Sequence, residues 1–221
     1  MDVETNLETI KKQIRQACRQ KNRNPEEITL IAVTKYVTIE RTMETIQAGI
    51  TDIGENRLDG FLEKYESIQD ATWHFIGTLQ SRKVKEVINK VDQLHSLDRM
   101  SLAKEVNKRR LEPLDCFVQV NVSGEETKHG LTPEDVLPFI RNIGSYENIR
   151  VTGLMTMAPH VEDKKVIRHV FRELRKLRDC VQDENLIHAP CEHLSMGMSN
   201  DFEIAVQEGA THIRIGTKLV G

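Results

Sequence analysis

The chain has 221 residues, 38% of them hydrophobic, and its 31 basic and 34 acidic residues give a formal net charge of −3. This length can bury one sizeable core, and no Ser/Gly-rich or Pro-rich linker divides the chain, so residues 1–221 are expected to form a single domain. The nearly balanced charge excludes a general attraction to nucleic acid or to an anionic membrane. An anionic ligand would therefore have to be held by local groups.

The first residues, MDVETNLETIKK, have a charged, helical pattern instead of the basic and then apolar pattern of a secretory signal. No apolar run is long enough to span a membrane. The four cysteines lie far apart and form no C-x-x-C pair, which argues against a zinc site and a disulfide framework. We therefore expect a cytoplasmic protein without a metal site.

The opening segment places Leu7, Ile10, Ile14 and Ala17 on one face, which predicts an amphipathic N-terminal helix. Short β-like segments follow and alternate with stretches whose apolar residues recur every three or four positions. The expected strands are Thr29–Lys35, Thr51–Glu55, Thr72–Gly77, Gln93–Leu97, Leu114–Val122, Arg150–Met157, Glu192–Met196 and His212–Gly216.

This alternation predicts an α/β fold, a (β/α)8 TIM barrel preceded by an extra helix. A doubly wound open sheet has the same periodicity and remains an alternative. In a barrel, functional side chains gather where strands end and loops begin. Unusual polar residues do occur there: Lys35 after TLIAV, Asn56 after DIGE, and Arg214 within the last strand.

Lys35 follows an apolar strand, so its amine is expected to be partly desolvated, which favours the neutral, nucleophilic form that Schiff-base chemistry requires. A strand-terminal lysine can also simply extend its ammonium group into solvent at the barrel rim, and for an isolated lysine this is the more common case. The neighbouring groups favour a functional role.

A phosphate group requires several converging N–H and hydroxyl donors, and Ser199, Gly216 and Thr217 offer them. These residues follow the seventh and eighth expected strands, where TIM barrels commonly bind phosphate. Ser199 can also act as a plain helix cap, and Gly216 as a turn residue. Their joint placement favours a phosphate site.

Three further residues have open assignments. Arg214 lies inside the β-like run HIRIG, where an inward guanidinium needs a ligand or a structural ion pair. His74, within WHFIG, fits a core histidine with one hydrogen bond as well as a ligand contact. Met196 either lines the pocket or fills the core.

The runs AVTKY, DIGENR, WHFIGTLQSRK, NVSGEETKHGL, GLMTMAP, HLSMGMSNDFEIAVQEGAT and HIRIGT occur in this order from about Leu30 to Thr217. Together they resemble the pyridoxal phosphate homeostasis protein family, the one-domain relatives of alanine racemase. The resemblance implies a barrel like the alanine racemase N-terminal domain, with pyridoxal 5′-phosphate (PLP) held as an aldimine on Lys35 of the AVTK motif.

The resemblance also implies the remaining cofactor contacts. The phosphate would be held around Ser199 and Gly216-Thr217, and Arg214 would face the pyridine nitrogen. The pocket wall would include the residues Asn56, His74 and Met196. Arg57 after GEN, Arg82 after LQS and the end of the chain at Gly221 depart from the family pattern. These positions lie outside the expected contacts, so they bear on local loop geometry.

Family members are thought to store, buffer or deliver the cofactor. The first hypothesis is therefore a PLP homeostasis protein without catalytic residues, a monomer or weak dimer that can pass PLP to apo-PLP-enzymes. An arginine at the pyridine nitrogen weakens the ring as an electron sink, because a guanidinium cannot accept the ring proton.

The second hypothesis is a PLP-dependent amino-acid racemase or lyase. Racemase relatives supply a second base, a tyrosine, from a separate β domain, and no residues follow Gly221 to build one. Tyr36 is next to Lys35, but alternation along a strand would point it to the opposite face. A third hypothesis is a sugar-phosphate barrel in which Lys35 acts as an aldolase-type lysine.

Overall fold

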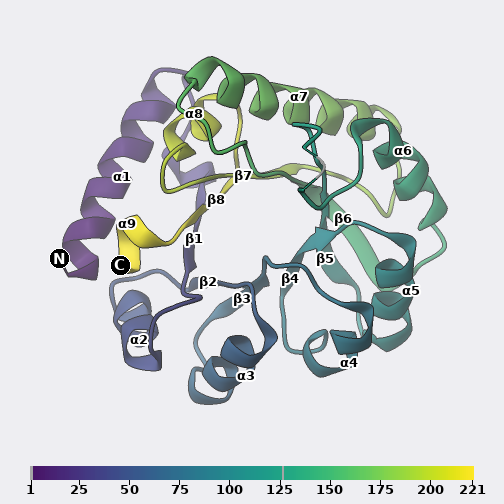
Figure 1. Ribbon diagram of the computed structural model, residues 1–221, viewed down its shortest axis with the longest axis horizontal. Helices are drawn as coiled ribbons and strands as arrows, with labels where there is room; N and C mark the ends of the chain where they lie inside the picture. Colours follow the sequence, from purple (N-terminus) through teal and green to yellow (C-terminus); the bar gives the residue numbers. More distant parts are fainter. Residues whose placement is uncertain (1, 126) are drawn as a thin grey trace.

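The computed structural model describes residues 2–125 and 127–221, and these residues form a closed barrel of parallel strands in the order β1 to β8. The last strand pairs with the first, with Thr29 opposite His212. Helices surround the strands on the outside (Figure 1). The predicted (β/α)8 barrel is confirmed, and the open sheet is excluded.

The strands are short and span β1 Thr29–Val33, β2 Asp52–Glu55, β3 Thr72–Phe75, β4 Gln93–Leu97, β5 Leu114–Gln119, β6 Ile149–Met155, β7 His193–Met198 and β8 His212–Ile215. The difference from the expected strands that affects the candidate site lies at β1, which ends at Val33. The Val37 amide donates to the Thr34 carbonyl at 3.2 Å, so residues 34–37 form a turn. Lys35 therefore lies beyond the strand on which it was predicted.

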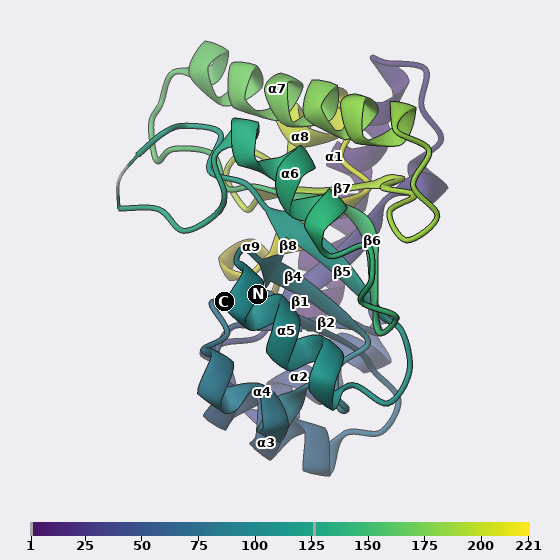
Figure 2. The same ribbon diagram turned by 90° about the vertical axis from the view of Figure 1, so that its right-hand side faces the viewer.

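The helices are α1 Val3–Arg19, α2 Ile39–Gln47, α3 Leu58–Ser67, α4 Val84–Val87, α5 Met100–Arg109, α6 Pro133–Asn142, α7 Lys164–Asp183, α8 Phe202–Gln207 and α9 Thr217–Val220, with 3-10 turns at Pro25–Glu27 and Ser81–Lys83. Figure 2 shows α7 along one side of the barrel and α3 with α4 on the opposite side. None of the helices in the described part of the chain is long and apolar enough to cross a membrane.

Apolar side chains on the outer face of the strands pack against the helices. Phe61 of α3, for example, contacts Trp73 and Phe75 of β3, with ring centroids 5.4 and 6.4 Å apart. Burying aromatic surface of this kind is a main source of folding free energy. The residue between them, His74, faces the barrel interior, because successive side chains on a strand point to opposite sides.

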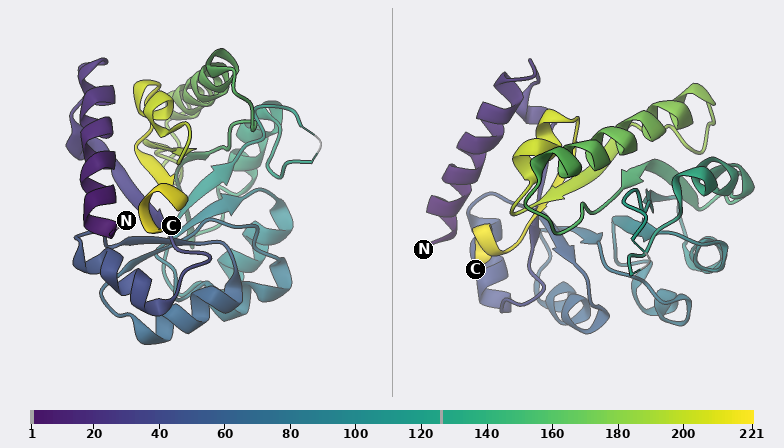
Figure 3. Two further views of the ribbon diagram at one scale, coloured as in Figure 1. Left: turned by 60° about the vertical axis from the view of Figure 1, so that its left-hand side comes forward. Right: turned by 45° about the horizontal axis from the view of Figure 1, so that its top comes forward.

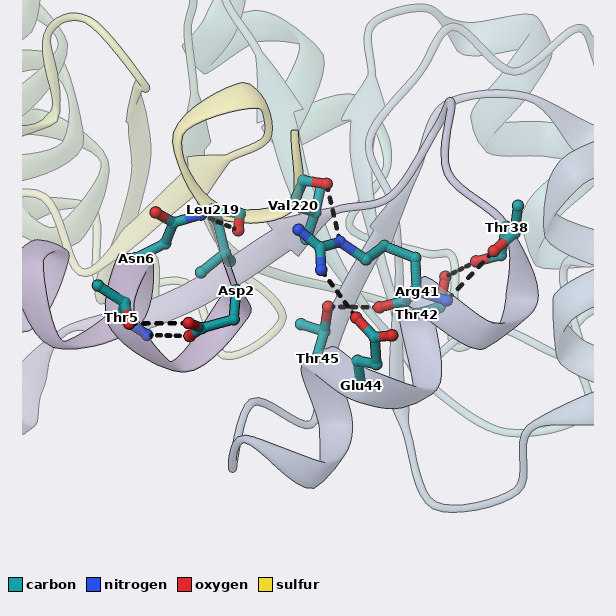
Figure 4. A network of polar contacts seen from close by, with 10 residues as sticks. All are labelled: Asp2, Thr5, Asn6, Thr38, Arg41, Thr42, Glu44, Thr45, Leu219 and Val220. Atoms are coloured by element: carbon teal, nitrogen blue, oxygen red, sulfur yellow. Dashed lines mark hydrogen bonds and ion pairs between the residues drawn. The ribbon is translucent and has the colours of Figure 1, made fainter.

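The N-terminal helix and the C-terminal helix lie side by side (Figure 3). Asp2 caps the start of α1, and its side chain accepts the Thr5 amide at 2.7 Å. Asn6 Nδ2 of α1 donates to the Leu219 carbonyl at 3.0 Å, and Arg41 Nε of α2 donates to the Val220 carbonyl at 3.1 Å (Figure 4). Two helices from the start of the chain thus hold α9 in place.

Candidate functional site

A cavity of about 720 Å³ opens at the carboxyl ends of the strands, the end at which TIM barrels carry their functional sites. The loops after β1, β2, β3, β5, β6, β7 and β8 contribute to its wall. Six of the eight predicted cofactor residues line it: Lys35, Asn56, Ser199, Arg214, Gly216 and Thr217.

Lys35 lies at the mouth of this cavity, on the turn after β1. Its side chain is exposed, so the desolvation expected at the end of an apolar strand is not present. Its Nζ lies 5.1 Å from the centroid of the Tyr36 ring. Tyr36 also lines the cavity, and the expectation that it points away from Lys35 is wrong, because strand alternation ends at Val33. The lysine is accessible both from the cavity and from solvent.

A buried ion pair fixes the start of the Lys35 turn. Lys64 Nζ of α3 donates to Glu55 Oε1 and to the Thr34 carbonyl, both at 2.5 Å. The Thr34 hydroxyl donates to the same Glu55 oxygen at 2.7 Å. The three side chains are buried and join the ends of β1 and β2. This cluster, which the sequence did not reveal, sets the positions of both Lys35 and Asn56.

Asn56 presents a polar atom that lacks a partner. Among the described residues, its Oδ1 is buried and accepts no hydrogen bond. Gly77 lies so close that an added Cβ would be 2.2 Å from the Asn56 carbonyl oxygen. A buried acceptor without a partner carries a free-energy cost of about 1–3 kcal/mol, which a bound donor group would remove. The cavity wall is thus suited to a polar ligand.

Arg214 of β8 supplies a buried positive charge to the cavity. It is 4% exposed and donates to Ser195 Oγ at 2.6 Å and to the Thr156 carbonyl at 2.9 Å. Burial lowers the pKa of the guanidinium to about 10, and the Asp201 carboxylate counteracts this shift. Arg214 therefore remains charged at neutral pH and acts only as a donor.

The chain after β7 and β8 surrounds the end of the cavity that was predicted to bind phosphate. Ser199 and Asn200 precede α8, and Thr217 begins α9. Asp201 Oδ1 accepts the Met198 amide at 2.5 Å, while the Asp201 amide donates to the Met198 carbonyl at 3.1 Å. The first amides of a helix have no intrahelical carbonyl, so these two helix starts leave amide donors free at this end of the cavity.

The structure places His74 and Met196 outside the cavity wall. His74 lies deeper in the barrel, where its Nδ1 is 3.0 Å from His95 Nε2 and its Nε2 is 2.9 Å from Asp52 Oδ1. Met196 is fully buried in the hydrophobic core. Its neighbour Ser195 points inward, so strand alternation turns Met196 towards the helices.

Other cavity residues were not singled out from the sequence. Gln119 lines the wall and donates from Nε2 to the His129 carbonyl at 3.1 Å. His129, His160 and Met157 line it as well. Gln119 stands in the apolar run FVQV, and a polar residue at the end of such a run was an available signal. The two histidines lie on loops, where no spacing rule points to them.

Within residues 2–125 and 127–221, no cluster of His, Cys, Asp or Glu could hold a metal ion. Cys116 and Cys191 are buried, and burial raises the pKa of both thiols, which keeps them protonated and unreactive. The polar chemistry of the cavity therefore comes from amine, guanidinium, amide, hydroxyl, imidazole and carboxylate groups.

Comparisons with known proteins agree with this geometry. Residues 5–221 match the family described as alanine racemase, N-terminal domain. A pyridoxal phosphate homeostasis protein of Aquifex aeolicus (strain VF5) is 43% identical over 220 residues, covering 97% of this chain and 96% of the relative.

Two solved structures are also similar. A crystal structure of an unknown protein from Bifidobacterium adolescentis has 33% identity and a TM-score of 0.93, covering 98% of this chain and 94% of that one. PipY of Synechococcus elongatus PCC7942, solved with PLP bound, has 28% identity and a TM-score of 0.81, covering 95% of this chain and 100% of that one.

The fold and the cavity thus define an alanine racemase-like barrel with a lysine at the mouth of its pocket. The chain belongs to the pyridoxal phosphate homeostasis protein family.

Proposed function

We propose that this protein binds PLP in the cavity at the carboxyl ends of the strands and holds it reversibly on Lys35, as a cytoplasmic reserve of the cofactor. The observation that carries the proposal is the position of Lys35, which lines the cavity and is also exposed. When bound, PLP supplies an aldehyde that condenses reversibly with an amine and a ring that can accept electron density. The name of the Aquifex relative and the PLP-bound PipY structure support this choice of ligand.

Each end of the cavity has groups suited to one part of PLP. The helix starts at Ser199 and Thr217 would hold the phosphate, since their amides and hydroxyls can donate to it. Asn56 Oδ1, which has no partner among the described residues, would accept a hydrogen bond from the bound ligand. Arg214 would face the ring and keep the nitrogen there unprotonated, because a guanidinium can only donate.

This arrangement favours storage over turnover. A charged arginine weakens the electron sink that PLP enzymes use to stabilise a carbanion. The exposed amine of Lys35, in contrast, lets an amine from outside displace the lysine from the bound aldehyde. Apo-PLP-enzymes are the recipients we propose, since each presents an active-site lysine of its own.

Borohydride reduction followed by intact-mass measurement tests the site directly. Before reduction, wild type loaded with PLP should show an absorbance band near the visible edge. After reduction, it should gain the mass of one reduced adduct on the peptide that contains Lys35. Lys35→Ala should lose both, while Lys90→Ala, which alters a lysine stacked on Tyr65 at the far end of the barrel, should retain both. An unchanged band in Lys35→Ala, or a sugar trapped in place of PLP, would overturn the assignment.

Delivery is tested with an apo-PLP-enzyme as recipient. The loaded protein is mixed directly with the apo-enzyme, or separated from it by a membrane that passes only free PLP. Reservoir behaviour predicts reactivation in both arms, at the rate of PLP release when the membrane is present. If the loaded protein reactivates nothing over many hours, the reserve function is wrong.

The position of Tyr36 gives a racemase or lyase some support, because its ring lies on the same cavity as Lys35. Both residues approach from the β1 side, however, whereas racemization requires bases on opposite faces of the substrate. Incubation with amino acids in deuterated water separates the two functions. We expect no exchange above that of free PLP; steady α-deuterium incorporation that is lost in Tyr36→Phe would establish an enzyme instead.

A further inference from the structure

A continuous chain of side-chain hydrogen bonds runs through the barrel to Arg214. Asp52 Oδ1 is 2.9 Å from His74 Nε2, and His74 Nδ1 is 3.0 Å from His95 Nε2. His95 Nδ1 is 2.9 Å from Ser195 Oγ, which accepts from Arg214 at 2.6 Å. Strands β2, β3, β4, β7 and β8 each contribute one residue, so the chain crosses the barrel interior.

The two ends of this chain lie in different surroundings. His74, His95 and Ser195 are fully buried, and Arg214 lines the cavity. The Asp52 side chain is 31% exposed. Asp52 is the first residue of β2, so it lies at the end of the barrel opposite the cavity. The chain therefore connects the cavity floor with solvent at the far end of the barrel.

The chemistry of the two ends fixes every proton between them. Arg214 can only donate, so Ser195 Oγ accepts from it, and the Ser195 hydroxyl proton is left for His95 Nδ1. His95 must then carry its proton on Nε2 and donate to His74 Nδ1. His74 in turn carries its proton on Nε2 and donates to the Asp52 carboxylate. Both histidines are neutral Nε2–H tautomers, with one proton in each hydrogen bond.

The surroundings of His95 favour this neutral state. Its ring stacks on the Phe117 ring of β5, with the ring centroids 4.2 Å apart, and meets the His212 ring of β8 edge-on, with the centroids 6.1 Å apart. Burial lowers the pKa of His95 well below its usual value, and the neighbouring His74, His212 and Arg214 lower it further. An added proton on His95 Nδ1 would make Ser195 Oγ accept from both His95 and Arg214, and the buried Ser195 hydroxyl proton would lose its acceptor.

We propose that Asp52, His74, His95 and Ser195 form a positioning relay that fixes the orientation of the Arg214 guanidinium at the cavity floor. This proposal depends on the proposed function in one respect, which is that the ligand facing Arg214 is PLP. The relay residues do not line the cavity and act through Arg214.

The first test uses the protein without cofactor, so it does not depend on PLP binding. Nitrogen-15 NMR of the imidazoles should show His74 and His95 as neutral Nε2–H tautomers near neutral pH, and the Arg214 guanidinium should rotate slowly. Ser195→Ala should release that rotation, and Ser195→Thr should restore it. His193→Asn is the matched control, since His193 shares the ring cluster through His212 but not the relay.

An Nδ1–H tautomer or a charged His95 in wild type would overturn the proton assignment. Slow guanidinium rotation that persists in Ser195→Ala would overturn the positioning role. The second test measures the dissociation constant for PLP. It should rise about tenfold in Ser195→Ala, which is the loss expected for one hydrogen bond to a charged group. In Ser195→Thr and His193→Asn it should stay within about twofold of the wild-type value. Equal affinities for Ser195→Ala and wild type would count against the relay, whereas failure of wild type itself to bind PLP would count only against the proposed function.

Discussion

Buried histidines make the stability of this barrel depend on pH, and His212 gives a measurable case. Burial, together with His193, His74 and Arg214, lowers the pKa of His212 from 6.5 to about 3. The native state therefore binds fewer protons than the unfolded state below pH 6.5, so stability is full above that value and is lost as the pH falls. The loss continues until the folded pKa is reached.

Between the two pKa values, one such histidine lowers the free energy of unfolding by about 1.4 kcal/mol for each unit of pH decrease. Lowering the pH from about 6.5 to about 5 therefore costs about 2 kcal/mol of stability through His212. The pKa of His95 is also well below its usual value, so His95 adds to this loss. The loss from His212 alone is a substantial part of the roughly 5–15 kcal/mol that stabilises a typical domain. Acidification should therefore measurably destabilise the protein.

Urea unfolding of the cofactor-free protein at about pH 7.5 and about pH 5 measures this loss. His212→Asn should reduce the pH slope by about 1.4 kcal/mol per unit. The pKa of Asp201 is raised by burial and works in the opposite sense, but it is common to both proteins and cancels in the comparison. A variant slope equal to that of wild type, or a free energy of unfolding that does not change with pH, would refute the reasoning.

Three further predictions concern packing and reactivity. Gly77→Ala should destabilise the fold by about 1–3 kcal/mol and weaken ligand binding, because its Cβ would overlap the Asn56 backbone; thermal unfolding and PLP titration measure both effects. Lys64→Met should lower the free energy of unfolding, measured in urea, by about 3–5 kcal/mol, because it leaves the Glu55 carboxylate buried without its cation. The double variant that also carries Glu55→Leu should recover most of this loss. A thiol reagent should modify the exposed Cys180 in the native protein and reach the other three cysteines, which are buried, only after unfolding; rapid reaction of all four thiols would contradict this burial.

Most of the fold was predictable because strand and helix periodicities alternate so regularly, and every expected strand overlaps an observed one. The position of Lys35 was harder to predict. The run TLIAVTKY gives no signal for the end of β1 at Val33, because that end depends on the hydrogen bonds around Thr34 and on the buried Glu55–Lys64 pair. Contacts between residues far apart in the chain decided the local structure.

The candidate site shows the same limit. Motif order identified Ser199, Gly216 and Thr217, which follow strand ends and line the cavity. Met196 was predicted to line the pocket, but its side chain points away from the barrel interior. Side chains alternate along β7, and Ser195 is the one that points inward, so Met196 points outward. His95 gave no signal in sequence, since its importance comes only from the partners that the barrel brings to it.

The closure of the barrel by its last strand has a consequence for biosynthesis. Residues 212–221 supply the ladder that joins β8 to β1, the Arg214 side chain, and the Gly216-Thr217 segment of the cavity. A ribosome completes this segment after all the other strands, so a nascent chain that lacks it has neither a closed sheet nor a complete pocket. The complete pocket therefore forms only after residue 217 has been synthesised, and translation that stalls before residue 212 would leave an open sheet edge for chaperones to protect.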